Sequence, residues 1–151
     1  MQLTLHTDYS FRVLIYLYVN SDSPATVGEI SDYYGVSHNH LVKVVNNLGH
    51  LGMVETVRGK GGGVRLLPHV ADLSAGTILR ELEGATPLVN CQGGGKSPKC
   101  AVLPICRFNR VLNSALDKFY QELDGYKLPD LVTQDIASGL PGQESGRSQT
   151  G

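Results

Sequence analysis

Apolar residues recur every three or four positions from residue 8 to residue 19, which is the spacing of a helix with one buried face. Thr7 is suited to cap this helix, and the charge of Asp8 suits its positive end. Asp8 and Arg12 are four residues apart, so they can pair on one face of the helix. The apolar stripe consists of Phe11, Leu14, Ile15, Tyr18 and Val19.

A second, shorter helix is predicted over residues 27–34, because Thr26 and Glu29 have the form of a capping box. Gly35 supplies the tight turn that follows, and Ser37 is suited to cap a third helix that extends to residue 51. A short helix, a glycine turn and a longer helix are typical of a helix-turn-helix, although a plain helical hairpin has the same outline. The inner stripe of the third helix consists of Leu41, Val44 or Val45, Leu48 and Leu51.

The outer face of the third helix carries hydroxyl, imidazole, amide and ammonium groups. No acidic residue occurs between residues 37 and 54. Groups of these types hydrogen-bond to base edges and phosphates when a helix lies in the major groove. The residues that we expect to contact DNA from this helix are Ser37, His38, Asn39, His40 and Lys43.

β-Branched residues at 53–57 and 64–67 flank a glycine-rich turn, which predicts a two-stranded hairpin. The net charge of the chain is −1, yet every charged residue between positions 56 and 71 is basic. They are Arg58, Lys60 and Arg65. A basic hairpin after a helix-turn-helix is typical of a wing that contacts phosphates or enters the minor groove. A glycine-rich tip also suits a nucleotide phosphate, but no helix N-terminus follows to complete such a site.

A long helix is predicted after residue 106, with apolar residues at four–three–four spacing. They are Leu112, Leu116, Phe119 and Leu123. One winged-helix region leaves little surface for so broad a stripe to cover, so we expect a homodimer. We divide the chain into a winged helix-turn-helix region (1–70), a connecting helix (71–90), a cysteine loop (91–106), a dimerisation helix (107–125), a C-terminal segment (126–136) and a tail expected to be disordered (137–151).

All three cysteines, Cys91, Cys100 and Cys106, lie within one stretch rich in glycine, proline and lysine. Three thiols cannot all pair within a chain, and a loop of this composition has no packed core of its own. Clustered thiolates order around a soft metal or an iron–sulfur cluster. Zinc is the first alternative, but it usually takes a Cys-x-x-Cys pair, which the sequence lacks. Three scattered cysteines, one or two of them buried, are the remaining alternative.

The bulk properties of the chain suit one domain of 151 residues, of which 41% are hydrophobic. The first eight residues lack the basic and apolar regions of a secretory signal. The longest apolar run, residues 13–19, is too short to span a bilayer. Together with the free thiols, these features indicate a protein of the reducing cytoplasm that has no membrane partner.

Eight stretches together resemble the iron–sulfur winged-helix repressors, and most closely the NsrR group, whose members sense nitric oxide. They are MQLT at 1–4, TDY at 7–9, YGVSHNHLVK at 34–43, VRGKGGG at 57–63, LRELE at 79–83, LVNC at 88–91, CR at 106–107 and DLV at 130–132. The resemblance covers about residues 1–135. It implies a mainly α-helical fold, in which a winged helix-turn-helix precedes the cluster loop and the dimerisation helix.

The resemblance further implies a regulator rather than an enzyme. It would be a homodimer that binds double-stranded operator DNA while it holds its clusters and releases DNA when nitric oxide attacks them. One 4Fe–4S cluster per subunit is favoured, with 2Fe–2S as the alternative. The implied ligands are Cys91, Cys100, Cys106 and Asp8 of the partner subunit, with Arg12 positioning Asp8. The gap of eight residues between the first two cysteines is longer than in the family.

Two other functions fit part of this pattern. An IscR-like regulator of cluster assembly, or a sensor of another redox signal, would have the same fold. A small iron–sulfur electron carrier belongs to a different class of protein, and it leaves the helix-turn-helix and the basic wing unexplained.

Overall fold

The computed structural model describes residues 2–84, 88–89, 100–133, 136 and 139. Cys91, the rest of the loop up to residue 99 and nearly all of the tail at 137–151 lie outside these residues. The helices and strands are, in chain order, α1 (Leu5–Val19), α2 (Val27–Tyr34), α3 (His38–His50), β1 (Val54–Val57), β2 (Gly63–Leu66), α4 (Ala75–Glu83) and α5 (Arg107–Asp124). Short 3₁₀ turns are η1 (Pro68–Asp72), η3 (Leu103–Ile105) and η4 (Leu128–Leu131).

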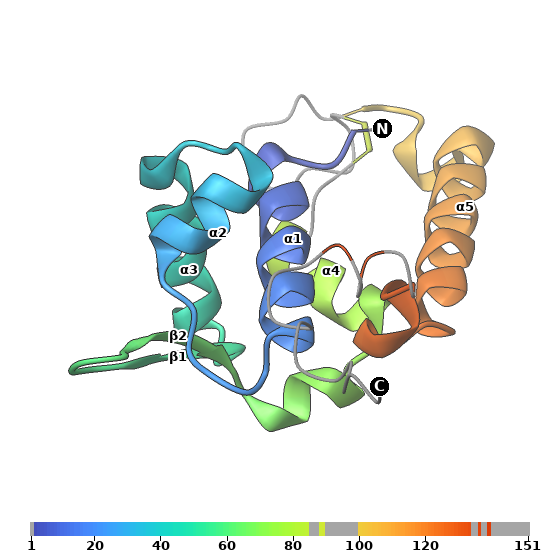
Figure 1. Cartoon of the computed structure of the whole chain (residues 1–151). Coiled ribbons are helices and arrows are strands. Elements are labelled where there is room, and N and C mark those ends of the chain that lie inside the picture. Colours follow the sequence, from blue (N-terminus) through green and yellow to red (C-terminus); the bar gives the residue numbers. More distant parts are fainter. Residues whose placement is uncertain (1, 85–87, 90–99, 134–135, 137–138, 140–151) are drawn as a thin grey trace.

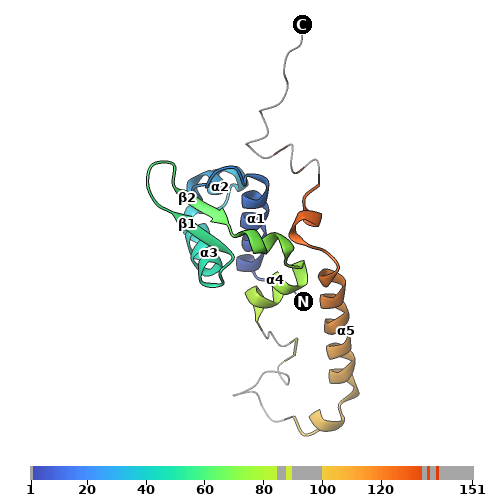
Figure 2. The same ribbon diagram turned by 90° about the horizontal axis from the view of Figure 1, so that it is seen from below.

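The elements are arranged around α1, as Figure 1 shows, with α2 and α3 on one side of it and α5 on the other. The antiparallel hairpin of β1 and β2 extends outward on the side of α3. Seen from below, α5 runs past α4 and away from the other helices (Figure 2). The mainly helical fold with a two-stranded wing confirms the predicted fold class. Among the described helices, none is long and apolar enough to cross a membrane.

The first helix begins three residues earlier than predicted. Thr4, and not Thr7, is the N-cap, and its hydroxyl accepts a hydrogen bond from the Thr7 N–H at 3.1 Å. Thr7 is fully buried, so its side chain packs inside rather than marking the helix start. Asp8 therefore lies at the end of the first turn, where its N–H donates to the Thr4 carbonyl at 3.0 Å. The periodic stripe does not include residues 5–7, which is why sequence periodicity placed the start too late.

The helix-turn-helix forms as predicted, except at one cap. The Thr26 N–H donates to the Glu29 carboxylate at 2.6 Å, and the Glu29 N–H donates to the Thr26 hydroxyl at 3.2 Å, which completes the capping box. Gly35 adopts a left-handed conformation with φ of +61°, as a tight turn after a helix requires. Ser37 precedes α3, but its side chain makes no capping hydrogen bond. Its hydroxyl is therefore not used to cap α3 and can form a hydrogen bond with another group.

The wing is tied to the body by a contact that the sequence did not predict. Ala25, just before α2, forms an isolated bridge to Val64 of β2, with N···O distances of 2.9 and 2.7 Å. A side chain at Gly63 would collide with the Ala25 backbone, because its Cβ would lie 2.6 Å from the Ala25 carbonyl oxygen. The close approach therefore requires glycine, and it fixes the base of the hairpin against the helix-turn-helix.

The hydrophobic core joins α1, α2, α3 and the hairpin into one body. Its largest fully buried side chains come from α1, α2, α3, α4, η1 and η4. They include Leu14, Leu17, Ile30, Leu41, Leu48, Val70, Ile78, Leu79 and Leu128. Within this cluster, α1 packs against α3, α4, β2 and η4.

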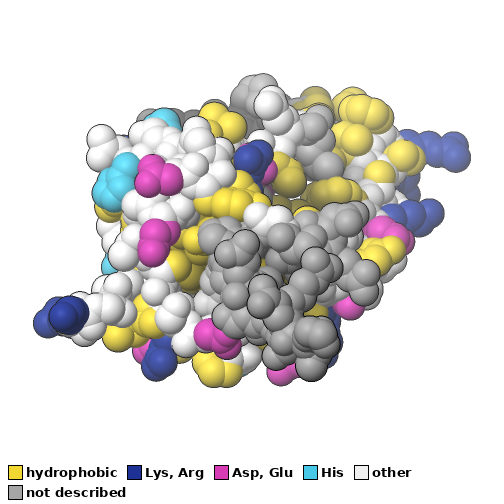
Figure 3. Space-filling model, in the orientation of Figure 1, with side chains coloured by type: hydrophobic (Ala, Val, Ile, Leu, Met, Phe, Trp, Pro, Cys, Tyr) yellow, Lys and Arg dark blue, Asp and Glu magenta, His cyan; other side chains and the backbone are white. Residues whose placement is uncertain are grey.

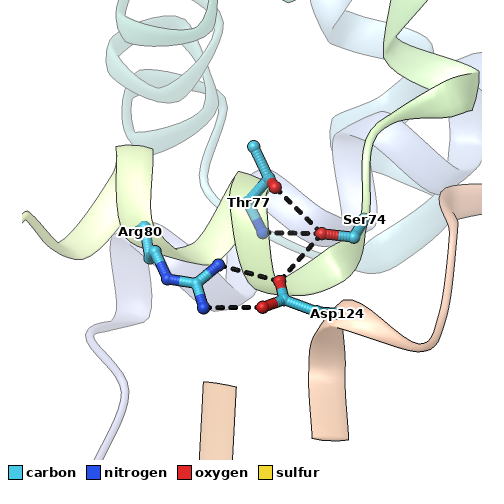
Figure 4. A network of polar contacts seen from close by, with 4 residues as sticks. All are labelled: Ser74, Thr77, Arg80 and Asp124. Carbon is cyan, nitrogen blue, oxygen red and sulfur yellow. Dashed lines mark hydrogen bonds and ion pairs between the residues drawn. The ribbon is translucent and has the colours of Figure 1, made fainter. Parts of the chain in front are cut away.

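A polar joint connects α4 to the end of α5 (Figure 4). Arg80 donates two hydrogen bonds to Asp124, at 2.8 and 2.7 Å, and the Ser74 hydroxyl donates to the same carboxylate at 3.0 Å. The hydrogen bond from Arg80 holds the pKa of Asp124 below its usual range. Gly76 lies under this carboxylate, where a Cβ would collide with it. The joint therefore depends on a glycine as well as on the bidentate ion pair.

Within the part of the chain that the structure describes, α5 has no buried residue. The predicted seam of Leu112, Leu116, Phe119 and Leu123 is only half-buried. Large apolar side chains at and before the start of α5 are more exposed, with 75% at Ile105 and 64% at Phe108. A soluble monomer rarely leaves so continuous an apolar surface uncovered. This surface supports the expectation of a homodimer.

Candidate DNA-binding surface and cluster site

The outward face of α3 lies opposite its buried side, which consists of Leu41, Val44, Val45 and Leu48. Positions separated by four, seven and eleven residues share one helical face. The most outward row is therefore Asn39, Lys43, Asn46 and His50, and all four are exposed. Asn46 and His50 were missing from the sequence prediction, although their spacing from Asn39 would have indicated them.

All five residues predicted to contact DNA from this helix are exposed: Ser37, His38, Asn39, His40 and Lys43. They do not share one direction. By helical spacing, His38 and His40 flank the outward row on opposite sides. The ring of His40 lies toward α1, with its centroid 6.4 Å from that of Tyr9. Asn39 and Lys43 are therefore the members of the predicted set that face straight outward.

The wing carries its basic residues in two different environments. Arg58 and Lys60 are exposed near the tip, next to Gly59 and Gly61, which both have positive φ. Figure 3 shows Lys and Arg side chains at the far end of the hairpin. These charges extend beyond the body on the same side as α3, as a wing that accompanies a recognition helix would require.

Arg65 differs from the two tip residues because it is paired. It lies directly across the hairpin from Glu55, and its Nε is 2.7 Å from the Glu55 carboxylate. Glu55 lies one residue before the basic stretch from which the wing was predicted. The cross-strand register, which only the structure gives, brings the two charges together.

Two of the three cysteines are within the described part of the chain. Cys100 and Cys106 are free thiols, both half-buried, and η3 connects them. The Sγ of Cys106 is the N-cap of α5 and accepts a hydrogen bond from the Asn109 N–H at 3.4 Å. Thiolates are the ligands that iron–sulfur clusters require. The thiols at this position therefore fit a cluster.

The predicted fourth ligand is on α1. Asp8 forms an ion pair with Arg12 at 2.9 Å and also accepts a hydrogen bond from its Nε at 3.2 Å. The Asp8 side chain is 45% exposed, and each of its oxygens accepts one contact from Arg12 and has a further lone pair. Among the described residues of one chain, no three His, Cys, Asp or Glu side chains form a metal-binding group. One chain therefore does not bring Asp8 together with Cys100 and Cys106.

Arg12 connects Asp8 to the helix-turn-helix. Its guanidinium lies 5.9 Å from the ring centroid of Tyr9 and 5.8 Å from that of Tyr34, the last residue of α2. The hydrogen bond to Asp8 raises the pKa of Arg12. Burial raises the pKa of Tyr34 to about 12. The Arg12 cation lies over the face of its ring. These contacts place Arg12 between Asp8 and the end of α2.

The comparison with protein families decides the identity. The family model named Rrf2, described as an iron-dependent transcriptional regulator, matches residues 3–134. The chain belongs to the Rrf2 family. It is therefore a transcriptional regulator, and regulators of this family bind DNA.

Solved structures with the Rrf2-type fold are similar over most of their length. T. potens IscR matches with a TM-score of 0.66 and 21% identity, covering 87% of this chain and 85% of that one. CymR, the global cysteine regulator of B. subtilis, matches with a TM-score of 0.60 and 22% identity, over 87% and 95%. The oxidized form of Staphylococcus aureus CymR matches with a TM-score of 0.66 and 22% identity, over 87% and 95%. At these identities, the similarity establishes the fold.

Proposed function

We propose that this Rrf2-family chain is a nitric-oxide-sensitive repressor whose homodimer binds operator DNA while each subunit holds an iron–sulfur cluster. One observation carries the proposal. Asp8, a half-exposed carboxylate, lies on the helix that packs against the recognition helix α3, while half-buried thiols lie at the start of the outlying helix α5. A bond between these two regions across a dimer would connect cluster chemistry to DNA binding.

The residues of the chain have separate tasks in this mechanism. Cys91, Cys100 and Cys106 would hold the cluster, and Asp8 of the partner subunit would complete the site. Arg12 orients the Asp8 carboxylate through its two contacts. When bound, the cluster supplies soft iron centres that react with nitric oxide. Because a carboxylate oxygen is a poorer ligand for such a site than a thiolate, Asp8 would be the most easily displaced of the four ligands.

Release of Asp8 would free α1 from the partner subunit. A helix-turn-helix dimer binds two half-sites about 34 Å apart, and small changes in the separation of its recognition helices weaken binding. The outward row of α3 would contact bases in the major groove, and Arg58 and Lys60 would contact phosphates or the minor groove. Besides Arg58 and Lys60, the DNA contacts that we propose include the six other residues predicted from the sequence. They are Ser37, His38, Asn39, His40, Lys43 and Arg65.

An IscR-like regulator of cluster supply is the second candidate. It is favoured by the structural similarity to T. potens IscR, and it would use the same cysteines. The two functions differ in their signal. A nitric-oxide sensor releases DNA when nitric oxide is added to the loaded protein, whereas a supply regulator responds to whether a cluster is present at all.

The test is an anaerobic preparation of the full chain, assayed for visible absorption, iron and sulfide. The loaded protein is used to select duplexes from a random pool, and their affinity is measured as nitric oxide is added. We expect a coloured, iron- and sulfide-containing protein that releases the selected duplex at a few nitric oxide molecules per cluster. A colourless, zinc-containing protein would overturn the proposal. Release only on complete cluster removal would favour the supply regulator.

Cysteine variants sharpen the same experiment. Cys91→Ala, Cys100→Ala and Cys106→Ala should each lose the cluster but keep the dimer, because α5 and its apolar surface are intact. His69→Ala is the matched control, since His69 is an exposed potential ligand outside the proposed set and should keep its iron. A cysteine variant with full iron content would remove that cysteine from the site.

A further inference from the structure

The helix that carries Asp8 is fastened to the recognition helix at two points besides the apolar core. The Nδ2 of Asn47 on α3 donates a hydrogen bond to the Nε2 of His6 on α1, at 3.0 Å. The ring of His40 on α3 lies against the ring of Tyr9 on α1, with the planes tilted by 30°. On α1, His6 lies two residues before Asp8 and Tyr9 lies one residue after it.

These two contacts bear on the register of α3 along α1 as well as on the distance between the two helices. His40 and Asn47 are seven residues apart, so they lie two turns apart on the same side of α3, about 10 Å along its axis. His6 and Tyr9 are three residues apart and share a side of α1. Apolar packing between the helices is non-directional and permits small sliding movements. A hydrogen bond has a fixed geometry, so the His6–Asn47 bond sets the register of α3 against α1.

Asn47 therefore differs from its neighbour Asn46, although both are amides on the recognition helix. Asn46 is exposed in the outward row, whereas Asn47 is half-buried with its amide turned toward His6. An asparagine that recognises adenine uses its carbonyl and its amino group together on one base edge. An amide held against α1 is not free to present both groups to a base.

We propose that His6 and Asn47 are positioning residues, which transmit the position of α1 to the recognition helix and do not themselves contact DNA. This inference rests on the proposed function, because it assigns the route by which engagement of Asp8 alters DNA affinity. When α1 is held by the partner's cluster, the His6–Asn47 bond holds α3 in the orientation that fits DNA. When α1 is released, the bond carries α3 with it.

The test compares DNA affinity of the cluster-loaded and the cluster-free dimer on the selected duplex, for each of several full-chain variants. The ratio of the two affinities measures the coupling. We expect His6→Ala and Asn47→Ala each to reduce this ratio about three- to tenfold, which is the range for loss of one hydrogen bond. Iron content should not change. The double variant should lose no more than either single variant, because both remove the same bond.

Two further variants separate positioning from general damage. His6→Gln places an amide acceptor near the position of Nε2 and should restore the ratio. Asn46→Ala should weaken the loaded and the cluster-free protein by the same factor, leave the ratio unchanged and alter the base preference of the selected pool. A wild-type ratio in Asn47→Ala would overturn the inference, as would an altered base preference in that variant.

The outcome for the wild-type protein distinguishes the two proposals. If loaded and cluster-free wild-type protein bind DNA equally, the proposed function fails. The inference then fails with it, because no coupling remains for the His6–Asn47 bond to carry. If the wild-type ratio is large but the variants match it, only the inference fails.

Discussion

At the scale of single residues, the surroundings of a side chain decide whether its charge is available to DNA. Arg65 is paired with Glu55 across the wing, while Arg58 and Lys60 extend from the tip. A surface ion pair contributes only about 0–1 kcal/mol, so a phosphate can compete for Arg65, but the competition lowers the gain from that contact. The three basic residues of the wing should therefore contribute unequally to DNA binding.

We predict that Arg58→Ala and Lys60→Ala each weaken binding to all duplexes and reduce the slope of log affinity against log salt by about 0.9 per lost phosphate contact. Arg65→Ala should reduce it less, because Glu55 already neutralises that charge. The measurement is a salt titration of DNA affinity. Glu55→Gln is the matched control: it frees Arg65 and should tighten binding. A slope change for Arg65→Ala as large as that for Arg58→Ala would contradict the prediction.

At the scale of elements, the ends of the helices determine how well each one is held. The capping box of α2 is complete, whereas Ser37 at the start of α3 makes no capping bond. The hydrogen bonds from the Thr26 N–H and hydroxyl hold the pKa of Glu29 below its usual range. The folded state therefore favours the ionised carboxylate, so the box stabilises α2 above the ordinary carboxyl pKa and loses this contribution as pH falls through the lowered one.

Thr26→Ala should accordingly lower the free energy of unfolding by about 1 kcal/mol at neutral pH, because it removes the cap of α2. The difference from wild type should shrink as the pH falls through the lowered pKa of Glu29. Thermal melts of the cluster-free protein at a series of pH values measure both effects. Ser37→Ala is the control, since it removes a hydroxyl without a capping bond. A Thr26→Ala difference that is constant with pH would show that Glu29 does not take part.

At the scale of the whole molecule, helix α3 with the wing and the half-covered helix α5 lie on opposite sides of α1 (Figure 1). The joint of Arg80 and Asp124 fixes the C-terminal end of α5 to α4, while its N-terminal end carries Cys106. A second copy that covers the apolar surface of α5 would bring the cysteine region of one subunit toward the other subunit. In such a dimer, Asp8 could ligate the cluster of its own subunit or that of the partner subunit.

Mixed dimers test whether Asp8 ligates the cluster of the partner. One dimer joins a subunit with Asp8→Ala to a subunit with Cys91→Ala. The only complete cysteine set then faces the intact Asp8 of the partner subunit, so the spectrum should be native. Asp8→Ala homodimers should show an altered spectrum, a changed response to nitric oxide and weaker DNA binding, because the bond between subunits is lost.

The control places both substitutions in one subunit and pairs it with a wild-type subunit. The complete cysteine set then faces the mutated position, and the spectrum should be that of the Asp8→Ala homodimer. If Asp8 belonged to the site of its own subunit, the two mixed dimers would show the opposite spectra. Identical spectra from both dimers would place Asp8 outside the site.

The sequence by itself determined those features that depend on residues within a few positions of one another. The capping box of Thr26 and Glu29, the left-handed turn at Gly35 and the glycine-rich hairpin were all predicted correctly. Local hydrogen bonds and backbone preferences decide such features, so their spacing along the chain is sufficient to identify them. The clustering of the cysteines is also a property of the sequence, although their geometry as a group stays a prediction.

The tertiary structure decided which distant residues meet. It paired Arg65 with Glu55 and turned Asn47 toward His6 while leaving Asn46 outside. None of these contacts has a local signature, because strand register and the rotation of one helix against another follow from the packing of the core as a whole. Two adjacent asparagines that look equivalent in the sequence thus differ in environment, since only one of them faces α1.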